Sequence, residues 1–136
     1  MSPPTPHLSP IKFTFAVVIS FTLQVFLFWI PIIGPFAASF IATFLTLNSR
    51  KQGFWASLLS TGIVGFGIAG ILLYAALAID KALWVVGAVV QSVFDISILQ
   101  YSLFLGLLLI LHTSVLGCLG GALAGYLKEK SHQKNL

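Results

Sequence analysis

Long apolar runs separated by short polar turns dominate the chain. The runs cover residues 13–30, 33–47, 54–78 and 98–127. At 1.5 Å per residue, the first run is about 27 Å long, close to the thickness of a hydrocarbon core. The pattern therefore predicts an all-α, polytopic membrane protein with four transmembrane helices.

The boundary between the first two runs is sharply marked. Pro31-Ile32-Ile33-Gly34-Pro35 places two prolines and a glycine within five residues, a pattern that ends a helix and forms a tight turn. The run after this turn is short, which leaves two interpretations open, a short spanning helix or a re-entrant one. The last run exceeds one bilayer thickness, so we expect it to tilt, kink or protrude.

The segment between the third and fourth long runs has a different pattern. Residues 82–94 are apolar but too few for a span. Every third or fourth position from 80 to 95 falls on one helical face, whose members are Asp80, Trp84, Ala88, Gln91 and Asp95. The opposite face is aliphatic. The pattern predicts an interfacial amphipathic helix over about residues 80–95.

The two ends differ from the body of the chain. Residues 1–11 contain four prolines and are expected to form a disordered or polyproline-II tail. Residues 12–127 are expected to form one membrane-embedded bundle, and residues 128–136 a polar cytoplasmic tail. The first run is too long for the apolar part of a signal peptide, so we interpret it as a retained transmembrane helix.

Composition narrows the class of protein further. Apolar residues make up 58% of the chain and charged residues 7%, against about 25% charged in soluble domains. This excludes a soluble enzyme, a nucleic-acid binder and a disulfide-stapled secreted domain. Cys118 is the single cysteine, so an intrachain disulfide is impossible. The lipid bilayer is the partner that the composition requires.

The distribution of charge predicts the orientation in the membrane. With four crossings, one side receives six basic residues: Lys12, Arg50, Lys51, Lys128, Lys130 and Lys134. Only Lys81 falls on the other side, beside Asp80 and Asp95. The positive-inside rule then places both termini in the cytoplasm. Every Trp and Tyr lies near a predicted interface, with Trp29, Tyr74, Trp84 and Tyr101 outside and Trp55 and Tyr126 inside.

Small residues recur every four positions in three of the runs, the spacing that lets membrane helices approach closely. The predicted packing positions are Gly34 and Ala38 in the second run, Gly53, Ser57, Thr61 and Gly65 in the third, and Gly117, Gly121 and Gly125 in the fourth. Two interpretations stay open for these glycine-zipper stripes. They pack helices within one chain, or they form the interface of a homo-oligomer.

Few residues within the runs could carry chemistry. His112 could relay protons, ligate a metal or bind a porphyrin; the alternative is a hydrogen bond to a neighbouring helix. Asp95 either caps the last helix or shares an outer cation or proton site with Asp80. Gln24 and Gln100 can bridge helices or line a pore.

The predicted spans contain no carboxylate to complete a catalytic triad, and no metal-binding or phosphate-loop motif is present. The sequence therefore predicts a non-enzyme without cofactor or metal.

Three motifs carry a family resemblance. With Pro31-x-x-Gly34-Pro35, Arg50-Lys51-x-Gly53 and Gly117-x-x-Gly120-Gly121-x-x-x-Gly125, the chain resembles a family of small, glycine-rich, four-helix membrane proteins of unknown function, best known from archaea. The resemblance covers about residues 13–78 and 103–127 and implies a fold and a membrane location. The segment 79–97 is longer here than is usual in that family. Small multidrug transporters differ, because they need an acidic residue in the first helix, and dimeric fluoride channels have charged pore motifs that this chain lacks.

Two hypotheses of function follow. The first is a non-enzymatic integral membrane protein that acts as an oligomer or as an accessory subunit of a membrane complex. Its basis is the combination of small-residue stripes with the lack of catalytic motifs. The second is a small ion or solute channel or transporter. It would use His112, Gln24 and Gln100 as polar lining, with Asp80 and Asp95 at the outer mouth.

Overall fold

The computed structural model describes residues 9–27, 29–82, 84–94 and 97–135, and these residues form five helices and no strand. The helices are α1 (Pro10–Leu27), α2 (Ile33–Thr46), α3 (Arg50–Ala82), α4 (Trp84–Phe94) and α5 (Ile98–Lys134). The all-helical class predicted from the sequence is therefore confirmed for this part of the chain.

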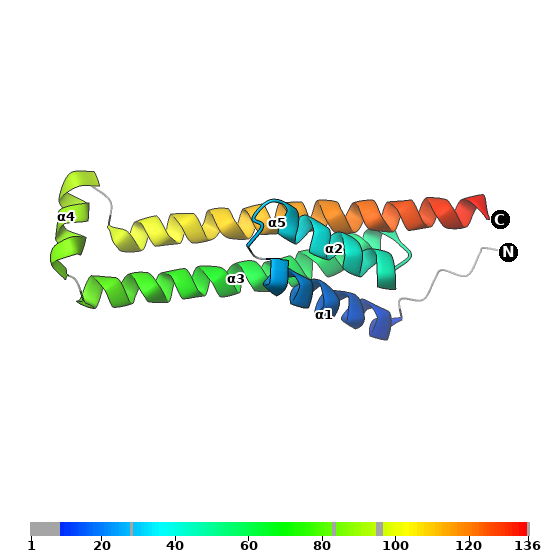
Figure 1. Cartoon of the computed structure of the whole chain (residues 1–136), viewed down its shortest axis with the longest axis horizontal. Helices are drawn as coiled ribbons and strands as arrows, with labels where there is room; N and C mark the ends of the chain where they lie inside the picture. The colour runs from blue at the N-terminus through cyan, green and yellow to red at the C-terminus, as the bar shows by residue number, and fades with distance from the viewer. Residues whose placement is uncertain (1–8, 28, 83, 95–96, 136) are drawn as a thin grey trace.

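A long antiparallel pair of helices forms the frame of the molecule. Helix α3 has 33 residues and α5 has 37, so they are about 50 and 55 Å long. Helix α4 lies across one end of this pair, and the start of α1 and the end of α5 lie toward the other (Figure 1). Helices α1 and α2 pack against only one half of the pair, the half that contains the start of α3 and the end of α5 (Figure 1). We call this the four-helix half, and the other the distal half.

Three helices are long and apolar enough to cross a membrane: α1, residues 50–79 of α3, and α5. This agrees with a membrane protein but provides fewer than the four predicted spans. Helix α2 is apolar but has 14 residues, which extend only about 21 Å. Helix α1 ends at Leu27, three residues earlier than predicted, and α2 begins at Ile33 as predicted. Gly34 and Pro35 therefore lie in the first turn of α2, where a proline is tolerated, and not in the break.

The long helices extend beyond the predicted apolar runs. Helix α3 covers 50–82 rather than 54–78, and α5 continues to Lys134, through most of the predicted polar tail. The residues after Gly125 include Lys, Glu and Gln, which favour a helix, and no proline stops it. The prediction at residue 127 located the end of the apolar run and not the end of the helix.

The predicted interfacial helix is a separate element but is shorter than expected. Helix α4 covers 84–94, whereas Asp80 belongs to the last turn of α3. The predicted face from Asp80 to Asp95 is therefore divided between two helices of different direction (Figure 1). Asp95 lies outside the described residues.

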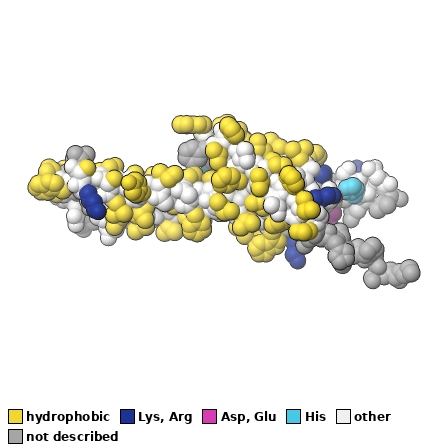
Figure 2. All heavy atoms as spheres, turned by 90° about the horizontal axis from the view of Figure 1, so that it is seen from below, with side chains coloured by type: hydrophobic (Ala, Val, Ile, Leu, Met, Phe, Trp, Pro, Cys, Tyr) yellow, Lys and Arg dark blue, Asp and Glu magenta, His cyan; other side chains and the backbone are white. Residues whose placement is uncertain are grey.

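Small side chains fill the interior, and large apolar side chains cover the outside. The buried set consists of alanines, serines, threonines and glycines, with Ala38, Ser39, Ser60 and Thr61 completely buried. Large apolar side chains such as Phe26, Phe66 and Ile71 are each exposed by more than two thirds of their surface. Apolar side chains cover most of the face seen in Figure 2, with several basic side chains near one end and another near the opposite end. This distribution suits a lipid surrounding, in which close helix contact stabilises the bundle.

Glycines let α3 and α5 approach closely at several points of the α3–α5 seam, the line along which the two helices meet. A Cβ at Gly53 would meet the carbonyl of Gly121, and one at Gly117 would meet the methyl group of Thr61. Toward the distal half, a Cβ at Gly65 would lie 3.0 Å from the Cα of Ile110. Gly125 is similarly closed off by Arg50, and Gly34 by the carbonyl of Leu27.

Candidate functional site

A cluster of buried polar side chains lies at the centre of the four-helix half. Ser20 and Gln24 come from α1, Ser39 from α2 and Ser60 from α3, and each is at most 3% exposed. Gln24 Nε2 donates to Ser20 Oγ at 3.1 Å and to Ser60 Oγ at 3.4 Å. Ser60 Oγ lies 2.8 Å and Ser39 Oγ 3.3 Å from Ser20 Oγ. The cluster links three helices through side-chain hydrogen bonds.

Local helix geometry explains why these groups meet. Ser20 and Gln24 are four residues apart and share one face of α1, together with the buried Ala16. That face packs against Ala56 and Ser60, which are likewise one turn apart on α3. The polar contact between α1 and α3 thus follows from sequence spacing, because both helices repeat small or polar residues every four positions and these positions face each other when the helices pack.

Two atoms of this interior have no partner among the described residues, Gln24 Oε1 and Ser57 Oγ. A buried polar atom without a hydrogen bond costs about 1–3 kcal/mol. Both hydrogens of the Gln24 amide face hydroxyl acceptors, so its oxygen remains available to accept from a further donor. The cluster therefore has unused capacity to bind a hydrogen-bond donor.

A small cavity of about 110 Å³ adjoins the cluster beneath the turn between α1 and α2. Its lining combines apolar residues with three polar ones: Gln24, Pro31, Pro35, Val64, Ile68, Leu109, His112 and Thr113. Volume of this order is enough for several water molecules. The cavity is the place in the described structure where the predicted candidates Gln24 and His112 come together.

His112 connects α5 to the turn. Its Nε2 lies 2.9 Å from the carbonyl oxygen of Pro31, an acceptor left free where the helix is broken. The carbonyl can only accept, so Nε2 carries the proton and donates. In the neutral ring, Nδ1 then remains an acceptor. This geometry corresponds to the second interpretation of His112, a hydrogen bond to a neighbouring segment. Within the described residues, no group of three His, Cys, Asp or Glu could hold a metal ion.

Gln100 has a local role at the start of α5 and neither bridges helices nor lines the cavity. Its backbone N–H donates to Ser97 Oγ at 3.2 Å, and its Oε1 accepts from the Ser97 N–H at 3.1 Å. This reciprocal pair is a capping box. The N-cap of α5 is therefore Ser97, whose hydroxyl accepts from the N–H three residues further along, in the first turn. The predicted cap, Asp95, lies outside the described residues. The predicted outer site rests on the side chains of Asp80 and Asp95, which lie outside what the structure describes.

Ser39 and Ser60 are members of the cluster that the sequence analysis did not single out. Both are hydroxyl residues inside apolar runs, next to the small-residue positions Ala38 and Thr61. A small residue in a membrane helix satisfies a packing pattern whether or not its hydroxyl finds a partner. The pattern alone therefore did not distinguish a packing serine from a hydrogen-bonding one.

A model of a family of unknown function (DUF5518) matches residues 10–127. The chain belongs to this family. The match includes the polar cluster, the cavity and His112, and it ends before the last two turns of α5. No curated protein and no solved structure matches the chain. Membership in DUF5518 therefore relates the whole helical body to other chains but supplies no site residue.

Proposed function

We propose that this DUF5518 protein is a non-enzymatic membrane protein that assembles through its helices with further membrane chains, as a homo-oligomer or as an accessory subunit. The observation that carries the proposal is the incomplete cover of the α3–α5 pair. Helices α1 and α2 stop halfway along it, and the distal half presents bare helix faces (Figure 1).

A membrane placement that supports this proposal follows from the aromatic residues. Trp55 and Tyr74, both exposed on α3, are about 28 Å apart along the helix, which matches a hydrocarbon core. The basic residues Lys12, Arg50 and Lys128 then lie at one surface, the proposed cytoplasmic side. Helix α4 lies along the opposite surface.

In this placement the turn between α1 and α2 lies inside the membrane. His112, which bonds to that turn, is about 16 Å along α5 from Tyr101. Helices α1 and α2 then form a re-entrant pair rather than two complete spans. Trp29, beside the turn, then lies within the membrane and not at the outer interface that the aromatic pattern predicted. Irregular backbone at such a depth requires protein cover. Ile32 and Ile33 at the turn are 65% and 61% exposed in the single chain, which favours cover by another chain.

The outer face of α3 has the geometry that close helix association needs. A Cβ at Gly62, Gly67 or Gly70 would find no atom within 4 Å, in contrast to the closed glycines of the seam. Gly62 also lines an apolar groove of about 610 Å³ with Trp55 and Phe66 of α3 and Ile110 of α5. Exposed glycines flanked by large side chains let a further helix approach closely.

We expect the protein, purified in native nanodiscs, to have the mass of a defined oligomer or of a complex with a stoichiometric membrane partner. Mass photometry, with identification of the co-purifying chains by mass spectrometry, measures this directly. A protein that remains monomeric, with no partner chain at any protein density, would contradict the proposal.

A second candidate function is passage of a small ion or solute, and the cavity favours it. Gln24, Thr113 and His112 place hydrogen-bonding groups at the proposed membrane mid-depth. If this is the function, the His112→Phe variant should lower proton flux into reconstituted vesicles by about tenfold or more. His132→Phe, in the last turn of α5, is the matched control. Equal flux in wild type and His112→Phe would remove this candidate.

A further inference from the structure

We infer that the basic end of the four-helix half binds an anionic phospholipid, with its phosphate between Lys12 and Lys128 and an acyl chain along α1. The inference rests on the proposed membrane placement, which brings this end to the level of the lipid headgroups. It does not depend on the proposed assembly.

The headgroup part of the site is a pocket of about 330 Å³ built from three parts of the chain. Lys12 comes from the start of α1, Thr46 and Asn48 from the end of α2 and the turn after it, and Lys128 from α5. The two lysines are far apart in sequence, and the fold brings them to one pocket. The Thr46 hydroxyl donates to the carbonyl of Ala42 at 2.6 Å, so its hydrogen is already used. The donors that suit a phosphate are the two ammonium groups and the side-chain amide of Asn48.

Lys128 is held in position at this pocket. Its Nζ lies 5.7 Å from the centre of the Phe44 ring, within the range of a cation–π interaction. Phe44 belongs to α2, so the contact orients the lysine between α2 and α5. A positioned ammonium group loses less conformational freedom on binding an anion than a free surface lysine does.

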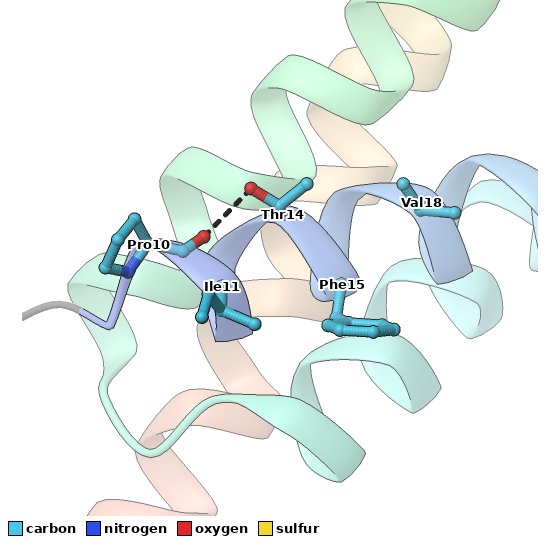
Figure 3. A pocket seen from close by; sticks show the side chains of 5 residues that line it. All are labelled: Pro10, Ile11, Thr14, Phe15 and Val18. Atoms are coloured by element: carbon cyan, nitrogen blue, oxygen red, sulfur yellow. Dashed lines mark hydrogen bonds between the residues drawn. The ribbon is translucent and has the colours of Figure 1, made fainter.

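The acyl part of the site is an apolar groove of about 410 Å³ along α1, lined by Pro10, Ile11, Thr14, Phe15 and Val18. Phe15 lines both this groove and the basic pocket, so the two are contiguous. Ile11 and Phe15 are one turn apart and point to the same side of α1 (Figure 3). The Thr14 hydroxyl donates to the carbonyl of Pro10 at 2.8 Å, so its hydrogen is already used (Figure 3).

Glu129, the acidic residue near this end of the described chain, does not lie in the basic pocket. Glu129 lines a different pocket with Ser49, Arg50 and Lys51, and its Oε2 lies 3.5 Å from the backbone N–H of Arg50. It is not among the residues that line the basic pocket. The two lysines there are thus not neutralised by Glu129. An anion with an attached apolar chain matches a basic pocket that opens into an apolar groove, and a phospholipid is the membrane component with this chemistry.

The test measures lipid retention by native mass spectrometry of the full chain, with phosphatidylglycerol and phosphatidylcholine as probes. We expect preferential binding of phosphatidylglycerol. Each of Lys12→Gln and Lys128→Gln should weaken it about fivefold. Lys81→Gln, at the opposite end, and Lys130→Gln, outside the pocket, remove the same charge and should leave the preference unchanged. Val18→Trp should fill the groove and weaken binding while both lysines remain.

Three outcomes would overturn the inference. The first is equal retention of both lipids by the wild type. The second is an equal loss from Lys130→Gln and Lys128→Gln, which would indicate diffuse attraction rather than a site. The third is thermal stabilisation by inorganic phosphate equal to that by the lipid, which would assign the pocket to a free anion. Unchanged retention of phosphatidylcholine by the lysine variants, and unchanged helical content of Val18→Trp by circular dichroism, verify that the variants are folded.

Discussion

Replacing Gly121 with alanine is expected to destabilise the α3–α5 seam by about 3 kcal/mol, because overpacking an interior without free space forces backbones apart. A methyl group at this position would overlap Ser57 Oγ and the carbonyl of Gly53. Ser57 is 1% exposed and Gly53 contributes backbone, so neither can move aside at low cost. Unfolding by a denaturing detergent, followed by circular dichroism, measures the loss.

The matched control is Gly70→Ala on the outer face of α3. A Cβ there meets no atom within 4 Å, and alanine is the better helix former. We expect this variant to be as stable as the wild type or more stable by up to about 1 kcal/mol. Equal destabilisation by the two substitutions would show that the seam is not packed as the structure describes.

The second large effect concerns assembly. Leucines at both Gly62 and Gly70 are expected to abolish the oligomer or complex, because they occupy the space that a further helix needs. The same positions are open in the single chain, so the double variant should keep its helical content and its stability. Particle mass in nanodiscs, together with circular dichroism, separates loss of assembly from loss of fold.

Ala78→Leu is the control for this experiment. Ala78 is exposed on α3 but lies one turn beyond Tyr74, outside the proposed hydrocarbon core in which Gly62 and Gly70 lie. The control should assemble as the wild type does. If the Gly62→Leu, Gly70→Leu double variant has the same mass as the wild type, the outer face of α3 is not the interface, and the proposed role of the groove is wrong.

Hydrophobic pattern alone determined the helical class and the general position of the helices. An apolar run of this length has few alternatives to a helix in lipid, because every backbone N–H and C=O must find a partner within the segment. The pattern was less informative about helix ends. Lys, Glu and Gln continue a helix as readily as leucine does, so α5 extended to Lys134 beyond its apolar part.

For single residues of the candidate site as well, the sequence pattern predicted some features and left others open. Gln24 was recognisable as a polar residue inside an apolar run, and the structure gives it hydrogen bonds to Ser20 and Ser60. Gln100 was recognisable on the same grounds, yet it caps α5 with Ser97. The two glutamines have different partners because they differ in their position along the helix. A glutamine at a helix start has free backbone groups beside it, whereas one in mid-helix must find a partner on another helix.

The sequence by itself therefore determined an all-helical chain suited to lipid, a break between the first two helices near Pro31 and the positions of the small residues. These properties depend on local composition and spacing, which a single chain segment already contains. Only the tertiary structure decided that α1 and α2 cover half of the α3–α5 pair, that His112 meets the Pro31 carbonyl, and that Lys12 and Lys128 share a pocket. Each of these is a relation between distant segments, which depends on how the helices pack against one another and not on the local sequence of any one of them.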